Sequence, residues 1–80
     1  MENHKRLLMY RVVLREEPEG GYTVTVPSLP GCVTYGEDIK EAYAMAEDAI
    51  LAYLESQAKH GETITDDSLT FEGVLHLDYA

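Results

Sequence analysis

GGYTVTVPSLPGCVTYGEDIKEAYAMAEDAI, residues 20–50, is the stretch that decides the fold of this chain. Residues 22–26 alternate large apolar side chains with threonine, which is the period of a half-buried strand. Pro27 has no N–H to donate to a neighbouring strand, so we expect the strand to end there. Leu29-Pro30-Gly31-Cys32 places proline and then glycine at the central positions of a turn, which predicts a type II turn.

A second short strand and a long helix are predicted to follow this turn. The strand covers residues 32–35, and Gly36 releases the chain from it. Asp38 and Glu41 form an acidic variant of the capping box, with Asp38 as the N-cap. The helix is predicted over Ile39–Lys59, with Gly61 as its stop. Its broad apolar face comprises Ile39, Ala42, Tyr43, Ala46, Ala49, Ile50, Tyr53 and Leu54.

Residues 7–15 have the alternation of an earlier strand. Its apolar face carries Leu8, Tyr10, Val12 and Leu14, and this face is expected to meet the helix. The other face is mixed and is expected to be solvated or to form an interface. Residues 16–21 contain Pro18 and a glycine pair, which predict the turn of an antiparallel hairpin.

A fourth strand is predicted over residues 69–79, where Phe71, Leu75, Leu77 and Tyr79 share one face. The order is therefore β-β-β-α-β, and a right-handed crossover places the last strand parallel to the first and beside it. The predicted fold is α+β in two layers: a mixed four-stranded sheet of order 3-2-1-4 with one long helix on one face. Residues 1–80 form a single domain whose first six residues are expected to fray.

The chain resembles the HicB family of bacterial and archaeal antitoxins over roughly residues 20–55. A tyrosine strand, the P-S-L-P-G-C corner, a short strand ending in glycine, an acidic N-cap and an alanine-rich helix follow in one order. The resemblance makes Pro27, Leu29, Pro30, Gly31, Cys32 and Gly36 signature positions, whose physical roles are turn formation and packing. It also implies a partial ribonuclease H-like fold and a partner, the small basic ribonuclease HicA, whose active site such antitoxins cover.

The charge balance narrows the class of partner. Fifteen acidic residues against six basic ones give a formal net charge of −9. Binding to nucleic acid favours the opposite sign, whereas a basic protein is a suitable partner. Acidity that only keeps the chain soluble is the alternative. One cysteine permits no intramolecular disulfide and fits a reducing cytoplasm, and no apolar run is long enough to span a membrane.

No catalytic or metal-binding constellation is evident, so we expect a binding protein without a cofactor and not an enzyme. A ribonuclease H-like nuclease holds metal ions on clustered carboxylates, but residues 7–15 contain no acid. Asp78 and Glu47 cannot form such a cluster alone. Cys32 has no histidine near it in the sequence, and His4, His60 and His76 lack the spacing of metal ligands.

Two sets of residues are candidates for binding. Those for a protein partner are Glu16, Glu17, Glu19, Tyr22 and Tyr35. Those for self-association form two competing surfaces, a helix stripe and an open sheet face: Ala44, Leu51 and Ala58, or Leu7, Met9, Val13 and Val74. A chain this short has a small core, which favours a dimer or higher homo-oligomer.

Two functions remain open at this point. The first is neutralisation of a HicA-type toxin, and the second is a stand-alone oligomeric interaction module without a toxin partner. Longer HicB proteins carry a C-terminal DNA-binding domain, whereas this sequence ends at Ala80, directly after the last predicted strand. We therefore expect no binding to DNA by this chain alone.

Overall fold

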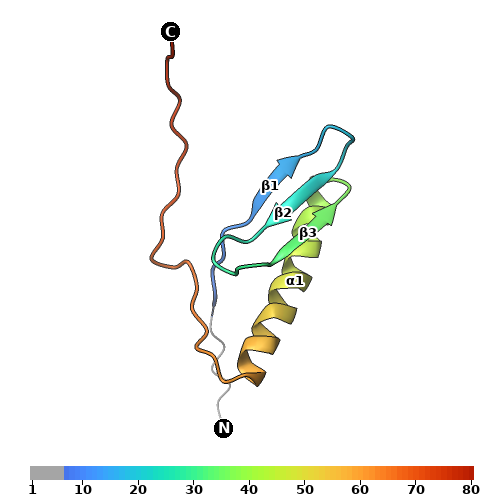
Figure 1. Cartoon of the computed structure of the whole chain (residues 1–80), viewed down its shortest axis with the longest axis vertical. Helices are drawn as coiled ribbons and strands as arrows, with labels where there is room; N and C mark the ends of the chain where they lie inside the picture. The colour runs from blue at the N-terminus through green and yellow to red at the C-terminus, as the bar shows by residue number, and fades with distance from the viewer. Residues whose placement is uncertain (1–6) are drawn as a thin grey trace.

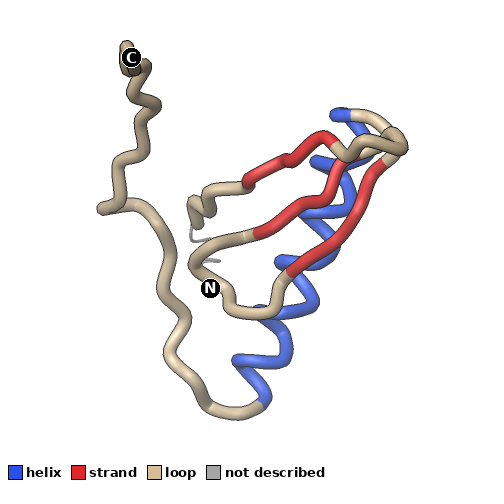
Figure 2. Tube along the Cα trace, turned by 45° about the horizontal axis from the view of Figure 1, so that its top comes forward, coloured by secondary structure: helices blue, strands red, loops and turns tan. Residues whose placement is uncertain are grey.

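The computed structural model describes residues 7–80, so the prediction of fraying at residues 1–6 lies outside the described part. The described chain contains three strands and one helix in the order β1 (Val13–Glu16), β2 (Tyr22–Thr25), β3 (Val33–Gly36) and α1 (Ile39–Lys59). The strands form an antiparallel sheet of order β1-β2-β3. The helix lies against one face of this sheet (Figures 1 and 2). The predicted α+β class with two layers is confirmed.

The register gives the sheet two distinct faces. Leu14 is opposite Val24, which is opposite Thr34, and Val24 packs against α1. Neighbouring residues of a strand point to opposite faces. The rows Val13–Thr25–Val33 and Arg15–Thr23–Tyr35 therefore lie on the face away from the helix, which we call the open face.

Two small side-chain clusters form the core. The first joins Val24 to Ala42 and Ala46 of α1, with Val12, Leu14 and Tyr22 packed against it. The second joins Val26, Leu29 and Cys32, with Tyr10, Ala49, Ile50 and Tyr53 around it. The predicted inward face of the first strand is thus confirmed at Tyr10, Val12 and Leu14.

The helix packs closely on β3 because both contact residues are small. A Cβ atom added to Gly36 would lie 2.4 Å from the backbone nitrogen of Ala42 and 2.5 Å from its Cα. Real Cβ atoms do not approach backbone atoms so closely, so only glycine fits this position without moving the helix. Asp38 caps the N-terminus of α1 as predicted, because its side chain accepts from the Glu41 N–H at 2.7 Å. The Glu41 carboxylate accepts from the Glu37 N–H at 2.5 Å, one residue before the N-cap that the capping box predicts.

The turn between β2 and β3 has the predicted geometry. The Cys32 N–H donates to the Leu29 carbonyl at 2.9 Å, and Gly31 has a φ of 83°. A positive φ at the third position defines a type II turn and favours glycine.

The first strand is shorter than the predicted 7–15. β1 begins at Val13, opposite Thr25 at the end of β2. One residue further, Val26 donates its N–H to Cys32 instead, and Pro27 has no N–H to continue the ladder. The backbone of residues 9–11 bonds instead to the turn at Asp66 and Asp67.

The predicted helix face is only partly buried. Ala42 and Ala46 are buried, and Ala49, Ile50 and Tyr53 pack against the second cluster. Ile39 and Tyr43 are instead 52 % and 57 % exposed, so the buried part of the face is narrower than predicted at the start of the helix. Among residues 7–80, no helix combines the length and apolarity that crossing a bilayer requires.

The predicted fourth strand, and with it the order 3-2-1-4, is not formed within the described chain. Residues 69–80 are extended but unpaired, and they lead away from the sheet (Figure 1). The radius of gyration is 15.4 Å, whereas a compact chain of this length has about 11.6 Å. Alternation predicts that a segment suits a strand, but not that its own sheet receives it.

Candidate functional site

The hairpin between β1 and β2 carries three of the predicted partner-binding residues at its tip. The Glu17 N–H donates to the Gly21 carbonyl at 3.0 Å, and the Gly20 N–H donates to the Glu17 carbonyl at 2.9 Å. These bonds close the turn and hold Glu16 and Glu19 exposed, with Glu17 half-buried. We call Glu16, Glu17 and Glu19 the acidic tip.

Tyr35 joins β3 to this tip. Its hydroxyl donates to the Gly20 carbonyl at 3.1 Å. The ring lies so close to Gly21 that an added Cβ there would be 1.8 Å from the hydroxyl oxygen. Tyr35 therefore lies beside the acidic tip, with 45 % of its surface exposed on the open face.

The electrostatics of this corner follow from the carboxylates around Tyr35. Desolvation of the Tyr35 hydroxyl raises its pKa above the ordinary value. The negative charges of four nearby carboxylates raise it further; they belong to Glu37, Glu41, Glu17 and Glu19. Tyr35 therefore stays a neutral hydrogen-bond donor at physiological pH. The first turn of α1 and the acidic tip together give this end of the sheet a concentrated negative charge.

The open face next to this corner is partly apolar. Val13 is 41 % exposed and Val33 is 58 % exposed, and Thr25 lies between them in the register. An apolar patch beside exposed carboxylates is the arrangement of a protein-binding surface, with an apolar centre and a charged rim. Of the predicted site residues, Glu16, Glu17, Glu19 and Tyr35 are thus grouped at one end of the sheet, and Val13 lies on the open face in the row at the other end.

Other predicted residues lie elsewhere. Tyr22 is half-buried and packs against the cluster on the helix side, so it is not on the open face. Leu7 and Met9 are exposed in the segment before β1. Val74 is exposed in the unpaired C-terminal segment, because the strand that would place it on the sheet is not formed.

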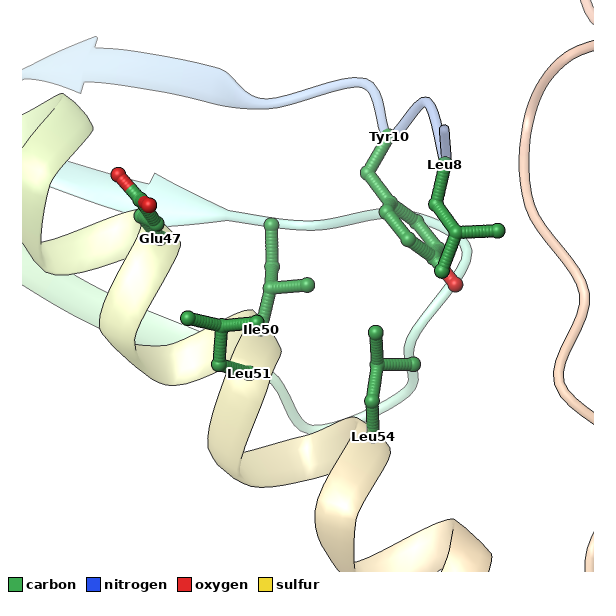
Figure 3. A pocket seen from close by; sticks show the side chains of 6 residues that line it. All are labelled: Leu8, Tyr10, Glu47, Ile50, Leu51 and Leu54. Atoms are coloured by element: carbon green, nitrogen blue, oxygen red, sulfur yellow. The ribbon is translucent and has the colours of Figure 1, made fainter. Parts of the chain in front are cut away.

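The predicted helix stripe is exposed along its length, at Ala44, Leu51 and Ala58. Leu51 also borders an open hollow of about 310 Å³ between α1 and the segment before β1, shown in Figure 3. Leu8 and Tyr10 line it from that segment, and the other lining residues come from α1: Glu47, Ile50, Leu51 and Leu54. We call this hollow the edge groove.

The signature positions have structural roles. Leu29 and Cys32 are buried together, and the Tyr53 hydroxyl of α1 donates to the Pro30 carbonyl at 2.9 Å. Burial raises the pKa of the Cys32 thiol, which reduces its reactivity. The P-S-L-P-G-C corner thus attaches the end of the sheet to the helix. Within residues 7–80, no three His, Cys, Asp or Glu residues are placed to hold a metal ion.

Asp67 is an important residue that the sequence analysis missed. It is buried, and it accepts hydrogen bonds from the Arg11 N–H at 2.8 Å and from the Ser28 hydroxyl. These two hydrogen bonds are the largest causes of the lowered pKa of Asp67. The Arg11 side chain, 3.3 Å away, lowers this pKa further, whereas burial of the carboxylate acts to raise it. A pair of acids in a polar connection gave no signal for this role in sequence.

Comparisons with known proteins identify relatives. The family described as "HicB_like antitoxin of bacterial toxin-antitoxin system" matches residues 10–80. A UPF0150 protein of Thermoplasma acidophilum is 44 % identical over 61 residues, covering 76 % of this chain and 88 % of the relative. A UPF0150 protein of Synechocystis is 32 % identical over 65 residues, covering 81 % and 82 %. Antitoxin HicB of Escherichia coli is 37 % identical over 57 residues, which cover 71 % of this chain but only 41 % of that protein.

Proposed function

The chain belongs to the HicB-like antitoxin family, and from this premise we propose that it neutralises a small basic ribonuclease of the HicA type by covering its active site. The observation that carries the proposal is the grouping of the acidic tip and Tyr35 beside the apolar patch of the open face. The family match supports a role in a toxin–antitoxin system. The choice of toxin and the mode of neutralisation are the proposal.

The charge of the chain supports this choice of partner. An enzyme that binds RNA presents cationic side chains at its active site, because those side chains contact phosphates. The acidic tip, with Glu37 and Glu41 nearby, presents carboxylates to such a surface. Opposite charges mainly accelerate association, whereas the buried apolar contacts determine how slowly the complex dissociates.

The open face supports occlusion as the mechanism. Val13 of β1 and Val33 and Tyr35 of β3 are exposed apolar or aromatic side chains on the face of the sheet that points away from α1. A partner docked there buries them while its basic residues meet the acidic tip. This mode requires no covalent change in the toxin.

The second candidate is an oligomeric interaction module without a toxin partner. The observation in its favour is the amount of apolar surface far from the acidic tip, in the edge groove and the C-terminal segment. This function predicts self-association but no affinity for a basic ribonuclease. A binding experiment with the toxin therefore separates the two.

The experiment measures association and dissociation rates with the purified HicA-type protein by stopped flow. Replacing Glu16, Glu17 and Glu19 together with glutamine should slow association about 10-fold or more at low salt and leave dissociation little changed. The matched control replaces Asp48, Glu55 and Glu62, which carry the same charge away from the tip. Equal slowing by both variants would show that only net charge matters and would remove the tip from the binding surface.

A second variant tests the open face. Val33→Glu places a charge on an exposed side chain, so the chain should stay folded. We expect faster dissociation of the toxin with little change in association. Unchanged dissociation would exclude the open face as the docking site.

A further inference from the structure

The C-terminal segment of residues 69–80, which we call the tail, has the sequence pattern of a strand with one apolar face. Side chains at odd positions are apolar apart from glycine, and those at even positions are mostly polar. The odd positions are exposed in this chain: Leu69 by 91 %, Phe71 by 95 %, Leu75 by 86 %, Leu77 by 81 % and Tyr79 by 98 %. This alternation is typical of a strand that covers an apolar layer, and here the tail covers nothing.

In the described part of the same chain, the sheet has an unpaired edge at β1, where a further strand could add. β1 is an edge of the sheet, so its outer N–H and C=O groups have no strand partner among residues 7–80. The edge groove opens beside it, between the segment before β1 and α1 (Figure 3). Its apolar lining of Leu8, Tyr10, Ile50, Leu51 and Leu54 includes no residue of the tail.

The tail is anchored at its start and free beyond. The Asp67 N–H donates to the Met9 carbonyl at 2.8 Å, the Thr70 N–H donates to the Asp67 carbonyl at 2.9 Å, and Glu72 lies 3.4 Å from the Arg11 guanidinium. Gly73 follows, with nothing within 4 Å of the place where its Cβ would be. Among the described residues, none after Glu72 has a hydrogen bond or ion pair.

We propose that two copies of this chain exchange their tails, so that residues 71–79 of each copy add a strand to the β1 edge of the other and fill its edge groove. The interface is isologous, because each copy gives a tail and receives one. The exchange supplies the fourth strand of the sheet from the second copy, by the backbone pairing that governs strand addition at an exposed edge.

Dimensions and direction favour a second copy as the source of the strand. Residues 71–79 span about 30 Å when extended, close to the length of about 32 Å of the 21-residue helix beside the groove. The tail is already extended, and it runs apart from its own sheet (Figures 1 and 2). The exchange also leaves the open face of each copy uncovered, so it is compatible with a partner bound there.

The test uses two variants of the full chain that damage opposite halves of the exchange. Leu75→Glu with Leu77→Glu removes the apolar face of the tail, and neither side chain contacts the body, so the fold of the chain is kept. Leu51→Glu places a charge in the groove on a side chain that is 57 % exposed. Sedimentation velocity at tens of micromolar should show a dimer for the native chain and a monomer for each variant.

Mixing the two variants distinguishes exchange from any other interface. The Leu51→Glu chain keeps a competent tail and the Leu75→Glu/Leu77→Glu chain keeps a competent groove, so the mixture should regain a heterodimer with one exchanged strand. The control is His76→Glu, on the polar side of the tail, which should remain a dimer. Circular dichroism of each variant checks that the helix is retained.

Three outcomes would overturn the exchange. A monomeric native chain whose tail amides resist hydrogen exchange would show that the tail folds onto its own sheet. Variants that stay dimeric would show that another surface holds the copies together. A mixture that stays monomeric, when both variants are folded, would show that the tail of one copy does not enter the groove of another.

Discussion

Replacing Gly36 with alanine tests whether a signature position acts through packing. The added Cβ would lie 2.4 Å from the backbone nitrogen of Ala42, so the first turn of α1 must move. Overpacking of this kind costs about 1–3 kcal/mol. The φ of Gly36 is not in the left-handed region, so alanine can adopt this backbone conformation. Because alanine also restricts the unfolded chain, it offsets about 0.4–1 kcal/mol of the cost of overpacking.

The net expectation for Gly36→Ala is a loss of about 1–2 kcal/mol in the free energy of unfolding. For a domain of this size that corresponds to a melting temperature lower by about 5–15 °C. Urea denaturation at a fixed protein concentration measures the loss directly, because stability depends on concentration in a self-associating chain. The folded variant should still bind its partner at the native rate, since Gly36 is buried.

The matched control is Gly73→Ala, where nothing lies within 4 Å of the new Cβ. This variant should change the free energy of unfolding by less than about 0.5 kcal/mol. An equal loss in both variants, or a Gly36→Ala chain as stable as the native one, would refute the packing role. Gly36 would then have to be explained by a contact outside the chain.

Three further outcomes are expected. The pKa of Asp67 is lowered in the folded chain, so its contribution to stability is complete above the ordinary value of 3.8 and is lost as the pH falls through the lowered value. Asp67→Asn should therefore reduce the melting temperature at pH 7, and the gap between the variant and the native chain should close in acid. A gap in melting temperature that is equal at every pH would contradict this role of Asp67. The Cys32 thiol, which is buried and has a raised pKa, should react with a thiol reagent at pH 7 much more slowly than after unfolding in urea, and equal rates would show that the corner is open. Addition of Mn²⁺ should produce no cleavage of RNA, and turnover that is lost in Asp78→Asn would reveal a nuclease site.

Much of the fold could be predicted because local signals determine it. The Asp38 cap and the glycine at position 61 fix the ends of α1, and the proline–glycine pair fixes the turn after β2. The alternation of residues 8–14 gave the inward face of the first strand correctly. Each of these signals acts within a few residues of the structure that it specifies.

The parts that could not be predicted depend on contacts between distant residues. The length of β1 is limited by Pro27, which follows the end of β2, and residues 9–11 bond to a turn more than fifty residues away. The tail has the pattern of a strand, but a pattern does not specify which sheet receives it.

The candidate site was partly predictable for the same reason. The acidic tip is local, so its exposure followed from the hairpin turn, whereas the bond from Tyr35 to Gly20 depends on the pairing of β2 with β3. Tyr22 was assigned to the partner-binding surface, although it shares the inward side of its strand with Val24 and packs near it. The two-residue alternation of this strand already places Tyr22 on the same side as Val24.

Co-expression with a small basic ribonuclease of the HicA type tests neutralisation most directly. The measurement is growth of a host in which the basic protein is induced alone, with the native chain, or with the Val33→Glu variant. We expect growth arrest by the basic protein alone, recovery with the native chain, and weaker recovery with the variant at equal abundance. A basic protein that does not arrest growth, or an arrest that persists when the native chain is abundant and folded, would contradict an antitoxin function.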